Sequence, residues 1–172
     1  LLLSLWSARK GVTALFEGIN IAYNELDHRN FLVKYALTYL FTIGMMIMGV
    51  LCLAIVVVFP IIIEFIGLPE WLDEILALTR WIILGGMIAI GLSLFYKIAP
   101  HRRNPTMPWV GFGAVIATGL WMLGSIGFSY YVDNFGSYNK TYGSFAAVII
   151  MLLWLLLTAF IILLGAEINS EM

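Results

Sequence analysis

Four long runs of apolar residues recur along the chain, and each is about as long as a helix that crosses a bilayer. The runs cover residues 35–59, 75–98, 110–131 and 145–165. A spanning helix needs about 20 mainly apolar residues, because hydrocarbon offers no partner for an unpaired backbone group and a helix pairs its own. Proline residues or polar clusters follow the runs, beginning with Pro60 after the first. The pattern therefore predicts four transmembrane helices in one membrane domain, residues 35–172.

The stretch before the first run has a different pattern. Between residues 8 and 27, apolar side chains recur at helical spacing, while charged and polar side chains occupy the opposite side. The apolar positions are Val12, Leu15, Phe16, Ile19, Tyr23 and Leu26. Because this stretch is too polar to span a bilayer, we expect an amphipathic helix that lies along the cytoplasmic interface or docks on the bundle. It belongs to a predicted cytoplasmic connection, residues 7–34, while residues 1–6 resemble the end of a truncated membrane helix.

The amino-acid composition supports an integral membrane protein. Hydrophobic residues make up 62% of the chain and charged residues 11%, whereas a soluble domain has about 45–50% apolar and about 25% charged residues. The net charge of −1 argues against a nucleic-acid partner, since phosphate binding needs a concentrated basic surface. The expected fold class is all-α: a polytopic transmembrane bundle of four complete spanning helices plus a cytoplasmic interfacial amphipathic helix.

The basic residues predict which way the protein faces. Lys and Arg in short loops stay on the cytoplasmic side of a membrane, and seven of the nine fall on one predicted side. These are Arg9, Lys10, Arg29, Lys34, Lys97, Arg102 and Arg103, whereas Arg80 and Lys140 fall on the other side. The asymmetry places the C-terminus in the cytoplasm. We expect Lys97, Arg102 and Arg103, in the turn "KIAPHRRNP", to contact lipid phosphates.

Small residues form a stripe along the third run. Gly113, Ala117, Gly124 and Gly127 are separated by four, seven and three positions. Helices in a membrane associate through close backbone approach, which small side chains permit. We therefore predict that these four residues pack against a neighbouring helix, an interpretation favoured over a substrate groove.

Polar residues gather on the predicted outer side. The connection "YYVDNFGSYNKTYGS" follows the third run, and Glu64 and Arg80 belong near the same face. The candidate residues for a polar outer cavity are Asp133, Asn134, Tyr138, Asn139, Tyr142, Arg80 and Glu64. Arg80, Asp133 and Glu64 could converge there as an ion pair or polar mouth. Two interpretations remain open for the tyrosines: an interfacial aromatic belt, or a segment that lines a polar cavity.

Catalytic signatures are missing from the sequence. Neither His28 nor His101 begins a metal-ligand motif such as H-E-x-x-H, and no P-loop or G-x-S-x-G motif occurs. The one cysteine, Cys52, lies inside an apolar run. We expect no catalytic residues, no metal site and no cofactor. An enzyme would have to use scattered residues that spacing does not reveal.

Three stretches resemble a known family. The run "NFGSYNKTYGSFAAVIIMLLWLLLTAFIILLGAEINSEM", the connection "LWSARKGVTALFEGINIAYNELDHRNF" and the turn "YKIAPHRRNP" are similar to the YihY/BrkB family of bacterial inner-membrane proteins. The resemblance implies six membrane helices with both termini cytoplasmic, of which this chain would hold helices three to six and the end of helix two. Some members carry the label ribonuclease BN, which the absence of a metal-ligand cluster here disfavours.

Two functions are compatible with these features. The first is transport or handling of a lipid or small amphiphile, because a polar outer connection accompanies glycine-rich spans. The alternative is a membrane scaffold or envelope-integrity factor that does not transport. The expected partners are membrane lipids, with envelope proteins or a second copy of the chain in the alternative, and no nucleic acid.

Overall fold

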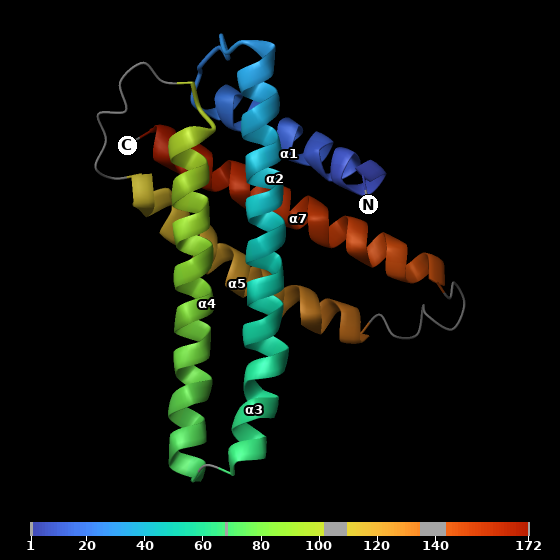
Figure 1. Cartoon of the computed structure of the whole chain (residues 1–172), viewed down its shortest axis with the longest axis vertical. Helices are drawn as coiled ribbons and strands as arrows, with labels where there is room; N and C mark the ends of the chain where they lie inside the picture. Colours follow the sequence, from blue (N-terminus) through green and yellow to red (C-terminus); the bar gives the residue numbers. More distant parts are fainter. Residues whose placement is uncertain (1, 68, 102–109, 135–143, 172) are drawn as a thin grey trace.

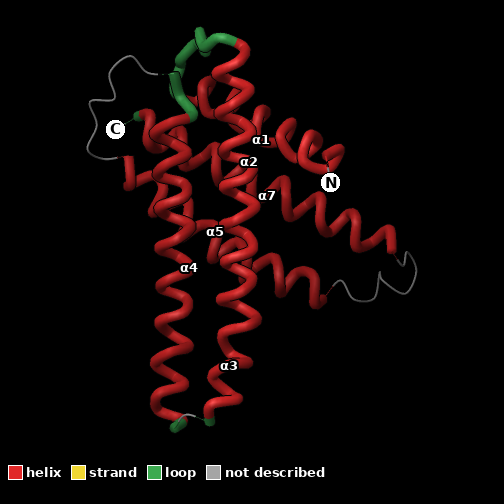
Figure 2. The backbone as a smooth tube through the Cα atoms, viewed as in Figure 1, coloured by secondary structure: helices red, strands yellow, loops and turns green. Residues whose placement is uncertain are grey.

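The structure is a computed structural model that describes residues 2–67, 69–101, 110–134 and 144–171. In this part of the chain every regular element is a helix, which confirms the all-α class (Figure 2). The elements are α1 (Leu2–Ala22), α2 (Phe31–Leu53), η1 (Ala54–Val58), α3 (Phe59–Ile66), α4 (Glu70–Ile98), α5 (Val110–Asn134) and α7 (Ser144–Ser170).

Four helical stretches are long and apolar enough to cross a membrane, as the sequence predicted. They are Phe31–Ile66, Ile75–Ile98, Gly111–Asp133 and Phe145–Ser170. The last three begin within one residue of the predicted runs, because the run of apolar residues itself marks where a helix can enter hydrocarbon. The first stretch is longer than expected at both ends.

Pro60 does not end the first membrane helix, contrary to the expected boundary at residue 59. α2 continues through the π-helical turn η1 into α3, and the N–H of Phe59 bonds to the carbonyl of Ala54, five residues back. A proline lacks the N–H that an α-helix needs at that position, and a single π turn accommodates such an interruption. The helix ends instead at Gly67, whose left-handed φ of 68° suits glycine.

The helices form two antiparallel pairs. α2 with α3 runs beside α4, and α5 runs beside α7 across the first pair at a steep angle (Figure 1). α4 also packs on α5, while α1 packs on α2 and α7. Below the crossing seen in Figure 1, the two pairs diverge.

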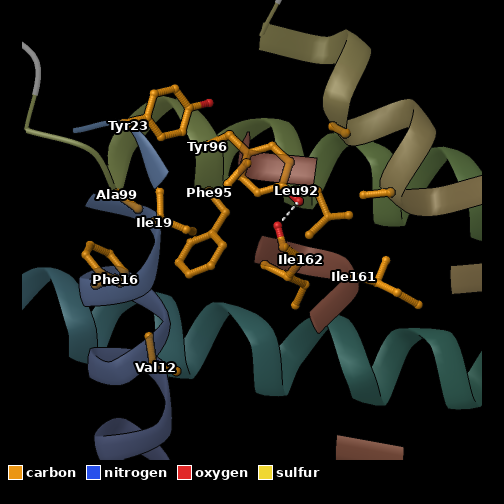
Figure 3. Packing of buried hydrophobic residues seen from close by; sticks show 13 residues of the cluster. Val12, Phe16, Ile19, Tyr23, Leu92, Phe95, Tyr96, Ala99, Ile161 and Ile162 are labelled. Atoms are coloured by element: carbon orange, nitrogen blue, oxygen red, sulfur yellow. Dashed lines mark hydrogen bonds between the residues drawn. The ribbon is translucent and has the colours of Figure 1, made fainter. Parts of the chain in front are cut away.

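The buried core lies where α1 meets the ends of the other helices (Figure 3). Its members are Val12, Phe16, Ile19, Tyr23, Leu92, Phe95, Tyr96, Ala99, Ala114, Ala117, Ile161, Ile162 and Ala166. Three residues of α1 in this set, and Tyr23 just after α1, are apolar positions that the sequence placed on one face. α1 is unbroken from Leu2 to Ala22, so no change of structure separates residues 2–6 from the connection that follows. Its position relative to a bilayer stays a prediction.

Three aromatic rings join α1 to both helices of the first pair. Phe16 is fully buried, and its ring centre lies 5.3 Å from that of Phe41 and 5.3 Å from that of Phe95. The rings of Phe41 and Phe95 are 5.2 Å apart. Both contacts of Phe16 are edge-to-face, which the ring quadrupoles favour. α1 is therefore held against α2 and α4 at the end of the molecule where the core lies.

The second pair is joined by small residues. At Gly165, an added Cβ would lie 2.5 Å from the hydroxyl of Tyr96 and 2.6 Å from the Cβ of Ala117. At Gly113 it would meet the carbonyl oxygen of Gly165 and the side chain of Asn169. α5 and α7 can therefore approach this closely only because neither position has a side chain.

The surroundings of the stripe predicted along α5 differ along its length. At Gly124 an added Cβ would make ordinary contacts, 3.4 Å from Ile161 and 3.5 Å from Leu157. At Gly127 no atom of the described residues would lie within 4 Å. The packing role expected for Gly127 therefore stays a prediction, while the closest approach of the two helices lies at Gly113 and Gly165.

Substitution of Gly113 by alanine should destabilise the protein by about 1–3 kcal/mol, because the new methyl group meets backbone and cannot be accommodated without a shift. The same substitution at Gly127, on the same helix, should be neutral or stabilise it by up to about 1 kcal/mol, since alanine favours a helix and the space is open. Loss of helical circular dichroism during titration with sodium dodecyl sulfate measures both. Equal behaviour of the two variants would contradict this account of the α5–α7 contact.

Candidate functional site

Arg29 binds the end of α4 from the connection between α1 and α2. Its Nη2 donates to the carbonyls of Ile98 at 2.7 Å and Pro100 at 3.3 Å, and its Nη1 donates to that of Ala99 at 3.2 Å. Its Nε donates to Nδ1 of His101 at 3.1 Å. The last carbonyls of a helix have no partner within the helix and carry partial negative charge. The guanidinium therefore supplies both hydrogen bonds and a compensating charge.

Asn20 joins the same helix end from α1. Its side-chain amide donates to the carbonyls of Phe16 at 2.8 Å and Ala99 at 3.4 Å, and its Oδ1 accepts from the backbone N–H of His101 at 3.1 Å. Only 5% of Asn20 is exposed. A buried amide costs free energy unless it is hydrogen-bonded, and here both ends of the side chain are bonded.

Two acidic residues neutralise Lys34 and Arg29. The carboxylate of Asp27 lies 3.9 Å from Nε of Arg29 and 3.9 Å from Nζ of Lys34, which is also 3.1 Å from Glu17. The Lys34–Glu17 pair is largely exposed, so it contributes little stability. These pairs fix the connection over the end of α1.

Arg9 has a different environment. Its guanidinium carbon lies 3.9 Å from the centre of the Tyr35 ring and 5.3 Å from that of Tyr39. Its Nη1 donates to the hydroxyl of Thr38 at 3.5 Å. Its Nε is buried and has no hydrogen-bond partner among the described residues. This is a cation held by aromatic faces at the first turns of a membrane-length helix.

An open pocket of about 680 Å³ lies beside the end of α4. It is lined by Glu25, Leu26, His28 and His101. In the part of the chain that the structure describes, no group of three or more His, Cys, Asp or Glu residues could hold a metal ion. The arrangement offers polar binding groups and no metal chemistry within those residues.

The predicted outer cavity is only partly within the described residues. Glu64 is exposed on α3, Arg80 lies on α4 with its guanidinium 5.7 Å from the ring centre of Trp81, and Asp133 is exposed near the end of α5. Among described residues no ion pair joins these three, and the α3–α4 turn and the end of α5 lie apart (Figure 1). Tyr138, Asn139, Tyr142 and the side chain of Asn134 lie outside the described residues, so the cavity itself stays a prediction.

The basic turn is likewise only partly described. Lys97 is exposed in the last turn of α4, where its side chain is available to solvent or lipid. Arg102 and Arg103 lie outside the described residues. Their predicted contact with lipid phosphates stays a prediction.

Comparison with known proteins decides the family. A family model described as Virulence factor BrkB matches residues 1–172. The chain belongs to this family. With its four membrane-length helices it is a multi-pass membrane protein, as the resemblance of the three sequence stretches implied.

Relatives of this BrkB-family protein are longer than the chain itself. The "Putative ribonuclease-like protein YfkH" of Bacillus subtilis (strain 168) is 33% identical over an alignment of 172 positions. The alignment covers 97% of this chain and 62% of the relative. The "UPF0761 membrane protein IL2447" of Idiomarina loihiensis is 28% identical over 94% of this chain and 56% of the relative. The chain therefore spans about three fifths of these relatives. No solved structure matches it.

Sequence reasoning missed the residues that tie this BrkB-family chain together. Asn20 is one of the polar residues opposite the apolar positions of the predicted amphipathic helix, yet it is buried against Ala99 and His101. Arg29 was counted as a topology signal, yet it binds the end of α4. Each residue is separated from its partners at the end of α4 by about 70 to 80 positions in the sequence. A polar residue at the edge of the apolar face of a helix is only a weak sign of a buried contact, and it does not show which residue the contact is with.

Replacement of Arg29 by glutamine should destabilise the protein by about 2–3 kcal/mol, because charge-assisted hydrogen bonds to the end of α4 are lost. Replacement of Lys97 by glutamine removes the same charge from the same helix end and should change stability by less than about 0.5 kcal/mol. Unfolding in mixed micelles, followed by helical circular dichroism, gives both values. A similar loss in the two variants would mean that net charge, not the hydrogen bonds, stabilises this end.

Proposed function

We propose that this BrkB-family protein transports or handles a lipid or small amphiphile between its two helix pairs, without being an enzyme. The observation that carries the proposal is the concentration of the buried core at one end of the molecule; among the described residues, the buried apolar side chains outside this cluster are Ile63, Leu84 and Ala146. In α2 and η1 the described buried residues are Thr38 and Thr42, both near the start of α2. In α7 no described residue between Ala146 and Ile161 is buried.

Apolar side chains beyond the core are exposed on both pairs. Examples are Ile47 and Leu51 on α2, Leu123 and Ile126 on α5, and Leu152 and Leu156 on α7. Exposed apolar surface of this extent needs acyl chains or other helices against it. Two pairs that diverge from a rigid end could admit acyl chains between them, which supports a role with lipids.

A ribonuclease function gains no support from the described residues. YfkH is named ribonuclease-like, but the described part of this chain has no candidate metal cluster. Two-metal sites and acid–base pairs are the usual means of phosphodiester cleavage. A membrane role without catalysis therefore accounts for more of the observed features.

We also propose that the protein lies in the bacterial inner membrane with its C-terminus in the cytoplasm, because basic residues concentrate at one end of the predicted spans. In a Cys52→Ser background, an Asp133→Cys variant should react with a membrane-impermeant maleimide in intact spheroplasts. A Glu171→Cys variant should react only after the membrane is permeabilised. The reverse labelling pattern would contradict this orientation.

A flux assay tests the lipid-handling role. The full-length protein, reconstituted in vesicles that contain a trace of headgroup-labelled fluorescent phospholipid, should raise the fraction of label that external dithionite bleaches above the outer-leaflet fraction. Protein-free vesicles and vesicles with an unrelated helical membrane protein of similar size are the controls. Bleaching equal to the controls, together with a stable homo-oligomer or a co-purified envelope protein, would favour the scaffold alternative.

A further inference from the structure

Arg9, unlike Lys34 and Arg29, has no counter-ion among the described residues. Lys34 is close to Glu17 and Asp27, and Arg29 is close to Asp27. No carboxylate among the described residues lies within ion-pair distance of Arg9, whose contacts are two tyrosine rings and the hydroxyl of Thr38. A partly buried cation is costly to leave without an anion. The positive charge of Arg9 is therefore not balanced by a carboxylate of the described residues, and a bound anion would balance it.

The geometry of the cluster suits a phosphate group. Tyr35 and Tyr39 have ring centres 5.1 Å apart and hold the guanidinium from the α2 side, which fixes its plane. Its Nε is buried, so a phosphate would bind the outer end of the planar fork, the two Nη groups, of which Nη1 also donates to Thr38. Arginine binds phosphate oxygens in a bidentate manner through such a fork.

The position of the cluster along α2 corresponds to the depth of lipid headgroups. The helical stretch Phe31–Ile66 has 36 residues, which at about 1.5 Å per residue is about 54 Å. The hydrocarbon core of a bilayer is only about 30 Å thick, so the first turns of α2 extend beyond it. Tyrosine rings are enriched at this level, and phospholipid phosphates occupy it.

We propose that Arg9, Tyr35, Thr38 and Tyr39 form a binding site for the phosphate of an anionic phospholipid headgroup, which deepens the proposed lipid-handling function by naming the class of lipid. The guanidinium binds the phosphate, the hydroxyl of Thr38 holds the guanidinium, and the two rings set its orientation. The acyl chains of the bound lipid follow the exposed apolar side of α2.

Lys10 provides the matched control. It is the neighbouring cation on α1, it is exposed, and its Nζ lies 3.8 Å from the centre of the Trp6 ring. Replacement of Lys10 by glutamine removes one positive charge from the same helix without touching the tyrosine cluster. A general attraction of the basic surface for anionic lipid predicts equal losses for the two residues, whereas a site at Arg9 does not.

Titration of the purified full-length protein in detergent with phosphatidylglycerol, followed by native mass spectrometry, tests the site. Arg9→Gln should weaken binding about tenfold, Arg9→Lys, which keeps the charge but loses the fork, about threefold, and Lys10→Gln less than about twofold. If Arg9→Gln does not fold, the comparison of Arg9→Lys with Lys10→Gln carries the test. No loss at Arg9, or equal losses at Arg9 and Lys10, would overturn the site.

Two further measurements separate the possible sources of phosphate and the two proposals. Inorganic phosphate at the same concentrations should not displace the lipid; displacement at equal concentration would overturn a lipid site in favour of a free anion. Arg9-dependent binding of phosphatidylglycerol without lipid flux would support the site and reject only the transport role. Flux with phosphatidylglycerol binding that is insensitive to Arg9→Gln would reject the site and leave the transport role.

Discussion

The structure depends on one contact, the insertion of Phe16 between α2 and α4. Its ring is fully buried against Phe41 and Phe95, and it holds α1 at the core end of an assembly that contains four membrane-length helical stretches. Lipid is as apolar as these helices, so apolar character alone does not hold them together. Shape-specific aromatic contacts and small-residue contacts supply the packing that hydrophobicity does not.

Hydrogen bonds at helix ends complete the same region. The hydroxyl of Tyr96 donates to the carbonyl of Ile162 at 2.7 Å (Figure 3), and Asn169 accepts the N–H of Gly113 at 2.9 Å. The N–H groups in the first turn of a helix have no partner within the helix, so Asn169 caps α5 from α7. Asn169, and Arg29 at the end of α4, pair backbone groups at helix ends that hydrocarbon would leave unpaired, whereas the Tyr96 bond joins α4 to the interior of α7.

The end of this BrkB-family protein around α1 is tightly packed, whereas the two helix pairs diverge away from it, and this difference bears on the proposed function. The polar bonds and the buried aromatic residues are concentrated around α1, so motion of one helix pair relative to the other is least restricted far from it. Lipid that enters between the pairs would meet apolar side chains along most of its length and a cation only near Arg9. In the proposed function, the fold would therefore separate an end that binds the headgroup from an apolar path for the acyl chains.

The sequence by itself determined the helical class and the four membrane-length helices, because both depend on local periodicity and on hydrogen bonds within one helix. It misjudged the end at Pro60, since whether a π turn carries the helix past a proline is not visible in composition. It also did not show which glycines of the stripe meet the closest approach of α5 and α7, which lies at Gly113 and not at Gly127, because spacing along one helix does not reveal the side chains of its neighbour. Only the tertiary structure decided that Asn20 and Arg29 bind the end of α4 and that Arg9 lies over Tyr35, because these contacts join residues far apart in the chain.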